Sequence, residues 1–175
     1  MMATHTLNMK EFFSSLDKAT SELLQLISSA GPVSINLIPF ANSWTAAQLS
    51  VHITKSNKAI AQALNMEGNS AERNPDARAE ELKKMFLDFS VKFNSPEFIR
   101  PQQDNYEKET ITEALKASVE HLKELRSKTN LSEIISLPEF GEITKLELLY
   151  FVLYHTQRHI YQLKNIFHEL KKDNN

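Results

Sequence analysis

The chain has 175 residues, enough for one compact domain with a sizeable core, and we expect residues 1–175 to form a single domain. Its 20 basic and 22 acidic residues nearly balance and form no block of one sign, which argues against nucleic acid or an anionic membrane as a partner. The absence of cysteine excludes disulfide bonds and thiolate metal ligands.

Helical periodicity covers most of the chain, and most of the 3 Gly and 6 Pro fall between the periodic segments. Apolar residues at i, i+3 and i+4 spacing predict a first helix over residues 9–29, which ends before Gly31 and Pro32. Residues 33–44, VSINLIPFANSW, alternate only weakly between apolar and polar side chains. We expect an ordered loop there, because Pro39 and the lack of a pairing partner argue against a strand.

A second helix is predicted over residues 44–65, with Asn42 or Ser43 as its N-cap. The turn-forming stretch GNSAERNP, residues 68–75, follows as a loop. A shorter third helix is predicted over residues 76–90, with one apolar face, and we expect it to be an accessory to the main bundle.

The connection KFNSPEFIRPQQDN, residues 92–105, contains two prolines and is long for a bundle, so we expect it to be functional or to form a well-packed lid. An amphipathic helix is predicted over residues 106–128 and, after the connection LPEFGEIT at residues 137–144, a last helix over residues 144–171. The pattern predicts an all-α protein, a four-helix bundle with a long loop between the third and fourth predicted helices.

The last helix carries two histidines one turn apart, in the apolar stretch LLYFVLYHTQRHIYQL. His155 and His159 are four residues apart, so both imidazoles project from one helix face, which also carries Leu148 and Val152. A buried imidazole without a partner costs about 1–3 kcal/mol, so each ring needs a compensating group. That group is either a backbone carbonyl or tyrosine hydroxyl for each ring, or a metal ion that both rings share, and two rings on one stripe favour the ion.

A metal site needs a third ligand, and His52 in the second predicted helix is the natural candidate. Its helix face also carries Gln48 and Ser56 and is of mixed polarity, so the alternative for His52 is a boundary position at the helix surface. The pairing of helices is not visible in a sequence, and spacing cannot decide between the two. We assign no role to the remaining histidines, His5, His121 and His168.

Residues 44–56, WTAAQLSVHITKS, and residues 137–163, LPEFGEITKLELLYFVLYHTQRHIYQL, resemble the two signature regions of the DinB-like (damage-inducible, DinB/YfiT-type) superfamily. The resemblance implies a four-helix bundle in which His52, His155 and His159 bind a divalent metal ion. It also implies a homodimer. That superfamily includes thiol-dependent S-transferases, a mycothiol-dependent isomerase and members without an assigned reaction, so the fold alone does not select the chemistry.

Three neutral imidazoles leave a tetrahedral zinc ion one ligand short, which is the pattern of a catalytic site rather than a closed structural one. Imidazole ligands also suit nickel, iron and copper, and we expect zinc or nickel. Gln48, four residues before His52, and Gln162, three residues after His159, are candidates for hydrogen-bonding the nucleophile or orienting the imidazoles. The alternative for both glutamines is exposure to solvent.

We therefore expect a metal-dependent enzyme, a hydrolase or a thiol-dependent S-transferase, that activates water or a low-molecular-weight thiol toward a small-molecule substrate. Thr156 stands where the zinc-protease motif H-E-x-x-H has its general base, which argues against peptide hydrolysis by that mechanism. One alternative is a non-catalytic stress-response protein that binds metal or a small ligand. The other alternative is a helical bundle in which protein groups satisfy the hydrogen bonds of the core histidines.

Two further expectations concern location and assembly. Residues 1–13, MMATHTLNMKEFF, lack the apolar core of a signal peptide, and the longest apolar run, LELLYFVLY, is far shorter than the roughly 20 residues of a membrane span. We therefore expect a soluble cytoplasmic protein with no membrane partner. The Phe-rich region 82–98 supplies apolar surface for the homodimer that the resemblance implies.

Overall fold

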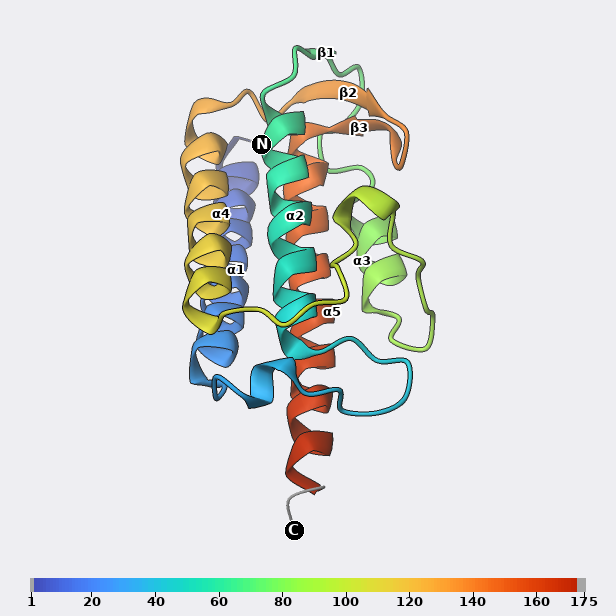
Figure 1. The fold of residues 1–175 in the computed structure, drawn as a ribbon. Helices are drawn as coiled ribbons and strands as arrows, with labels where there is room; N and C mark the ends of the chain where they lie inside the picture. The colour runs from blue at the N-terminus through green and yellow to red at the C-terminus, as the bar shows by residue number, and fades with distance from the viewer. Residues whose placement is uncertain (1, 173–175) are drawn as a thin grey trace.

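The computed structural model describes residues 2–172, and the side chains of residues 8–172. It contains a four-helix bundle (Figure 1), built from α1 (Met2–Ser29), α2 (Ala46–Leu64), α4 (Lys108–Lys128) and α5 (Lys145–Lys172). The short helix α3 (Ala79–Leu87) packs against α5 outside the bundle, on the side away from α1 and α4 (Figure 1). The predicted four-helix bundle with an accessory third helix is confirmed.

The order of the helices explains the long connection that the sequence contains. In Figure 1, α1 and α5 run from the top of the view to the bottom, whereas α2 and α4 both run upward. Because α2 and α4 are parallel, residues 65–107 must return along the length of the bundle before α4 begins. This return segment, residues 65–107, includes α3 and the short 3-10 helix η2 (Glu97–Ile99), and it passes across the outer face of α2.

A small antiparallel sheet lies over one end of the bundle, and the sequence did not predict it. It has the order β1 (Asn69–Ser70), β2 (Glu133–Leu137), β3 (Gly141–Thr144). Residues 68–75 and 137–144 were expected to be connections. These strands are too short to show clear periodicity, and the hairpin is held by tertiary contacts, since Ile135 pairs with Ile143 and both side chains are buried.

The N-terminus of α2 is capped by Thr45, not by Asn42 or Ser43. The Thr45 side chain accepts a hydrogen bond from the Gln48 backbone N–H at 3.1 Å, and Gln48 Oε1 accepts one from the Thr45 backbone N–H at 3.0 Å. This reciprocal capping box satisfies two of the amide groups that a helix start leaves unpaired. Asn42 instead occupies the left-handed region, with φ of 63°, in the turn before the helix.

A buried ion pair anchors the start of α5. Glu147 is fully buried, and its carboxylate accepts hydrogen bonds from the Arg73 guanidinium at 2.5 and 2.7 Å. The same carboxylate accepts backbone N–H groups of Arg78 at 2.8 Å and Thr144 at 2.9 Å. Burial opposes the charge, but these donors outweigh it and lower the pKa of Glu147. The pair therefore ties the segment before α3 to the first turn of α5.

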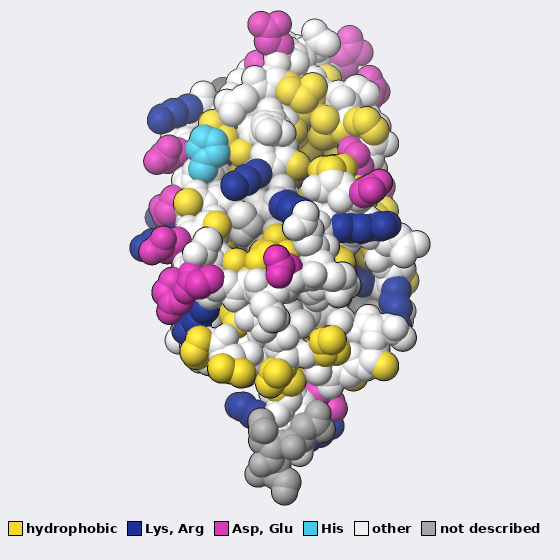
Figure 2. All heavy atoms as spheres, in the orientation of Figure 1, with side chains coloured by type: hydrophobic (Ala, Val, Ile, Leu, Met, Phe, Trp, Pro, Cys, Tyr) yellow, Lys and Arg dark blue, Asp and Glu magenta, His cyan; other side chains and the backbone are white. Residues whose placement is uncertain are grey.

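The core lies between the four bundle helices. Its fully buried side chains include Leu23, Ile27, Leu49, Ile53, Leu115, Leu148, Leu149 and Leu163. No helix in the described part of the chain is long and apolar enough to cross a membrane. Charged side chains of both signs lie side by side on the face drawn in Figure 2.

Candidate metal centre

Helices α2 and α5 bring three histidines together inside the bundle. The Nε2 atom of His155 lies 3.2 Å from Nε2 of His52 and 2.9 Å from Nε2 of His159. All three side chains are buried. His155 and His159 meet because one turn of α5 separates them, whereas His52 reaches them only because α2 packs against α5. This is the one group of three or more potential ligands, within the described residues, whose donor atoms lie close enough to share an ion.

The outer nitrogens of two rings are occupied by acceptors. Nδ1 of His52 lies 3.0 Å from the carbonyl oxygen of Ile99, and Nδ1 of His159 lies 2.5 Å from Oε1 of Gln162. A carbonyl oxygen can only accept, so each Nδ1 carries the proton and each Nε2 keeps its lone pair. If Nε2 of His155 carries a proton, it can donate a good hydrogen bond to only one of the two neighbouring Nε2 atoms. A metal cation, in contrast, can accept the lone pairs of all three Nε2 atoms. The donor set and its orientation therefore fit a divalent ion.

The surroundings keep the three imidazoles neutral. Burial lowers the pKa of His52 and outweighs the opposing effect of the Ile99 carbonyl. Burial, with the neighbouring His52, lowers the pKa of His159 to about 3, and burial with the charges of His159 and His52 holds the pKa of His155 well below its usual value. Neutral imidazoles are the form that binds metal, so these rings need no deprotonation at neutral pH.

The two predicted positioning glutamines have different partners. Gln162 contacts His159 directly, as described above. Gln48 is buried and reaches the Thr45 backbone and, through Nε2, the carbonyl oxygen of Gln102 at 3.1 Å. Within the described residues, no hydrogen bond joins Gln48 to a histidine ring. Gln48 therefore acts on the return segment over α2 and not on the imidazoles.

Three side chains on one face of α2 hold that return segment in place. Gln48, His52 and Lys55 donate to the carbonyl oxygens of Gln102, Ile99 and Arg100, at 3.1, 3.0 and 2.7 Å. These donors occur at i, i+4 and i+7, so they form one stripe along the helix. The long connection predicted at residues 92–105 is thus packed over the histidine cluster, in part through the ring of His52 itself.

Sequence reasoning missed Arg158, which lies between the two α5 histidines in HTQRH. Its buried guanidinium donates to the carbonyl oxygens of Phe86 at 3.1 Å, Asp88 at 3.0 Å and also Val91. These carbonyls belong to the C-terminal end of α3 and the loop after it. A charged residue on so apolar a face was the available signal, because a buried guanidinium requires several acceptors.

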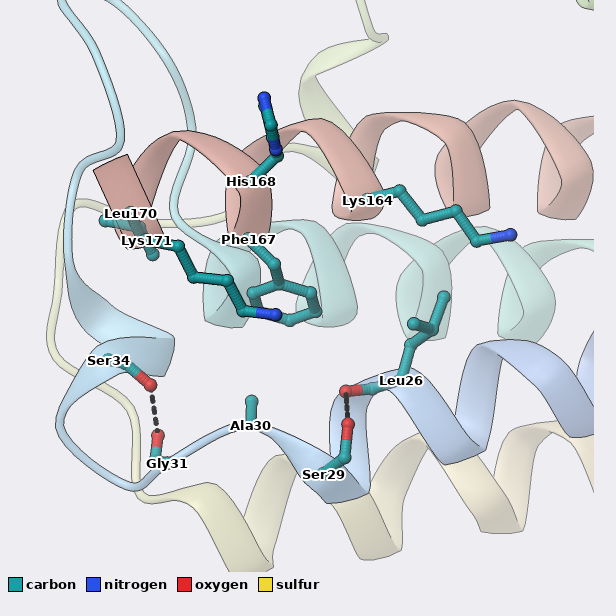
Figure 3. A pocket seen from close by; sticks show the side chains of 10 residues that line it. All are labelled: Leu26, Ser29, Ala30, Gly31, Ser34, Lys164, Phe167, His168, Leu170 and Lys171. Carbon is teal, nitrogen blue, oxygen red and sulfur yellow. Dashed lines mark hydrogen bonds between the residues drawn. The ribbon is translucent and has the colours of Figure 1, made fainter. Parts of the chain in front are cut away.

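The other histidines lie away from the cluster. His121 and His168 are exposed, and the His5 side chain lies outside the described residues. His168 borders a hollow of about 650 Å³ between the C-terminal ends of α1 and α5, and its ring points away from Phe167 (Figure 3). None of the three clustered histidines lines this hollow. It is therefore separate from the candidate metal centre.

Removal of the Gln162 acceptor is expected to weaken metal binding. Gln162→Ala frees Nδ1 of His159 to lose its proton or turn its ring, and the loss of such an outer partner typically costs about 10- to 100-fold in metal affinity. Gln48→Ala is the matched control, and we expect it to leave the affinity near the wild-type value. A zinc titration against a chromophoric chelator measures both. If Gln162→Ala binds zinc as tightly as the wild type, Gln162 does not orient the ligand.

The comparisons with known proteins show the family of the chain and agree with its fold. A sequence model of the DinB superfamily matches residues 15–163. The four-helix bundle protein TT2238 has a TM-score of 0.58 and 18% identity, over 89% of this chain and 98% of that one. YfiT from Bacillus subtilis, described as a probable metal-dependent hydrolase with an unusual four-helix bundle topology, has a TM-score of 0.56 and 14% identity, over 93% of this chain and 87% of that one. No curated protein matches the sequence.

Proposed function

The chain belongs to the DinB superfamily, and from this premise we propose that His52, His155 and His159 bind one divalent metal ion in an enzyme that activates water or a thiol. The reaction is hydrolysis of a small molecule or transfer to a thiol sulfur. One observation carries the proposal, the convergence of three Nε2 atoms with the outer nitrogens of His52 and His159 held by acceptors. Zinc and nickel are the ions we expect, since both accept neutral imidazole ligands.

The ligand count favours a catalytic ion over a structural one. Three protein ligands leave at least one coordination position for an exchangeable group, and the ion supplies Lewis acidity that lowers the pKa of a water or thiol held there. The protein's own residues keep the three imidazoles neutral, so they do not reduce the ion's positive charge. The description of YfiT as a probable metal-dependent hydrolase supports the hydrolytic alternative for this chain.

The residues around the cluster supply position and shelter rather than a general base. Within the described residues, no carboxylate hydrogen-bonds any of the three rings. Trp44 lies beside His52, with ring centroids 5.1 Å apart, and Phe151 stacks on His155 at 4.9 Å. These rings exclude water from two sides of the cluster, which strengthens electrostatic interactions inside it.

A cobalt-substituted sample tests the proposal directly. Addition of 2-mercaptoethanol is expected to create a sulfur-to-cobalt charge-transfer band in the near ultraviolet, because a thiolate enters the exchangeable position. Azide and a rise in pH are expected to change the visible spectrum of the cobalt protein. If saturating thiol, azide and pH all leave the spectrum unaltered, a protein group blocks that position, and the chain is a non-catalytic protein that binds metal.

Self-association as a homodimer stays a prediction from the resemblance. Exposed apolar side chains in region 82–98, including Phe89 and Phe98, are available for such contacts.

A further inference from the structure

Three phenylalanine rings lead from the candidate metal centre to the surface. Phe151 stacks on the ring of His155, and Phe86 meets Phe151 edge to face at 5.0 Å between centroids. Phe93 follows at 5.4 Å from Phe86. Phe151 is buried, Phe86 is half-buried and Phe93 is 44% exposed. We call Phe86, Phe93 and Phe151 the aromatic wall, because their rings pack in series from a candidate metal ligand to a partly exposed side chain.

Arg158 holds two members of this wall in position. It donates to the carbonyl oxygen of Phe86 at the end of α3 and to those of Asp88 and Val91 just after that helix. Its guanidinium carbon also lies 4.8 Å from the centroid of the Phe93 ring. The end of α3, which carries Phe86, and the loop that carries Phe93 are thereby attached to α5 between the two histidines of that helix.

The cations near the cluster are engaged by the chain's own carbonyl groups. The charges of Lys55 and Arg158 act on the histidine rings. Lys55 donates to the Arg100 carbonyl, and Arg158 donates to three carbonyls at the end of α3. Within the described residues, no carboxylate hydrogen-bonds Arg158 or a clustered ring. A ligand group beside the wall therefore contacts aromatic rings, because the charged groups of Lys55 and Arg158 already donate to backbone carbonyls.

We propose that the aromatic wall determines specificity, and that the small molecule at the ion places an uncharged apolar group, aromatic or aliphatic, against Phe86 and Phe93. A charged group in that place would lose hydration against the rings without gaining a partner. Arg158 is a positioning residue in this scheme, since it acts through the loop it holds. The inference rests on the proposed function, because it takes the exchangeable position of the ion as the point of attachment.

Competition between thiols on the cobalt-substituted protein tests the inference. Phenylmethanethiol carries an apolar ring, 2-mercaptoethanesulfonate carries a charge, and their thiols have similar acidity. Titration of the charge-transfer band measures the dissociation constant of each. We expect phenylmethanethiol to bind about tenfold more tightly or better, because part of its ring leaves water against the wall.

Three variants test which residues cause the preference for the apolar thiol. Phe86→Ala and Phe93→Ala are each expected to reduce the ratio of the two dissociation constants severalfold, with cobalt content unchanged. Phe93 is the safer position for folding, since its side chain is partly exposed. Phe89→Ala is the matched control, because Phe89 stacks on Tyr161 at 4.1 Å and, among the described residues, its ring has no ring contact with a member of the wall. It is expected to leave the ratio unchanged.

The possible results separate the inference from the function on which it rests. Equal binding of the two thiols to wild-type protein, or a preference that survives both wall variants, overturns the role of the wall and leaves the ion site intact. Absence of the charge-transfer band with every thiol overturns the proposed function itself. A preference that only Phe86→Ala and Phe93→Ala reduce supports the inference.

Discussion

Replacement of His52, His155 or His159 by Ala is expected to abolish stoichiometric metal binding, whereas replacement of His121 or His168 is expected to leave the metal content at the wild-type level. Each clustered ring contributes one Nε2 atom to the group. We expect each loss to exceed the roughly 10- to 100-fold reduction in affinity that follows removal of an outer hydrogen-bond partner, because a ligand itself is lost. Inductively coupled plasma mass spectrometry on dialysed protein measures the effect.

The two exposed histidines serve as matched controls for non-specific binding through imidazole. His5→Ala is a third control from the start of the chain, where the histidine was assigned no role. Circular dichroism should show that every variant keeps the helical content of the wild type. His52→Ala with full metal content would contradict a three-ligand site, and only the pair on α5 would then remain as ligands.

Replacement of Glu147 by Ala is expected to destabilise the protein by about 3 kcal/mol, the lower end of the cost of breaking a buried ion pair. The lower end applies because the Arg73 side chain is 31% exposed, so its charge regains hydration when the carboxylate is lost. The backbone N–H groups of Arg78 and Thr144 lose their acceptor as well. Urea denaturation followed by circular dichroism measures the free energy of unfolding.

The effect of Glu147→Ala depends on pH in a defined direction. The pKa of Glu147 is lowered in the folded protein, so the unfolded chain binds the proton more readily than the folded one. The stabilisation is therefore complete above the ordinary glutamate pKa of 4.5 and is lost as pH falls through the lower folded value. The difference between wild type and variant should shrink in acid.

Glu80→Ala is the matched control for this ion pair. The Glu80 side chain is 74% exposed and pairs only loosely with Lys83, at 3.9 Å. Exposed pairs of this kind contribute little to stability, so we expect a denaturation midpoint close to that of the wild type. If Glu147→Ala and Glu80→Ala unfold at the same urea concentration, the buried pair does not anchor α5.

Features that depend on neighbours along the chain were predictable from the sequence. The helical spacing of apolar residues placed five helices within a few residues of their observed bounds, except that α1 begins at Met2 rather than Met9. The shared face of His155 and His159 follows from helix geometry alone. The small sheet was missed, because β1 and β2 pair residues that are 63 and 65 positions apart, and no local pattern records that pairing.

Spacing within single segments was enough to predict the helical bundle, the histidine pair on α5 and the long connection before α4. The contact of His52 with this pair, the hold of Gln48 on the return segment and the hold of Arg158 on the end of α3 became visible only in the folded structure. Helix packing and the path of the return segment bring together residues that are 47 to 103 positions apart in the chain. Such contacts depend on how whole faces pack, and a periodic pattern specifies which face is apolar but not which partner it meets.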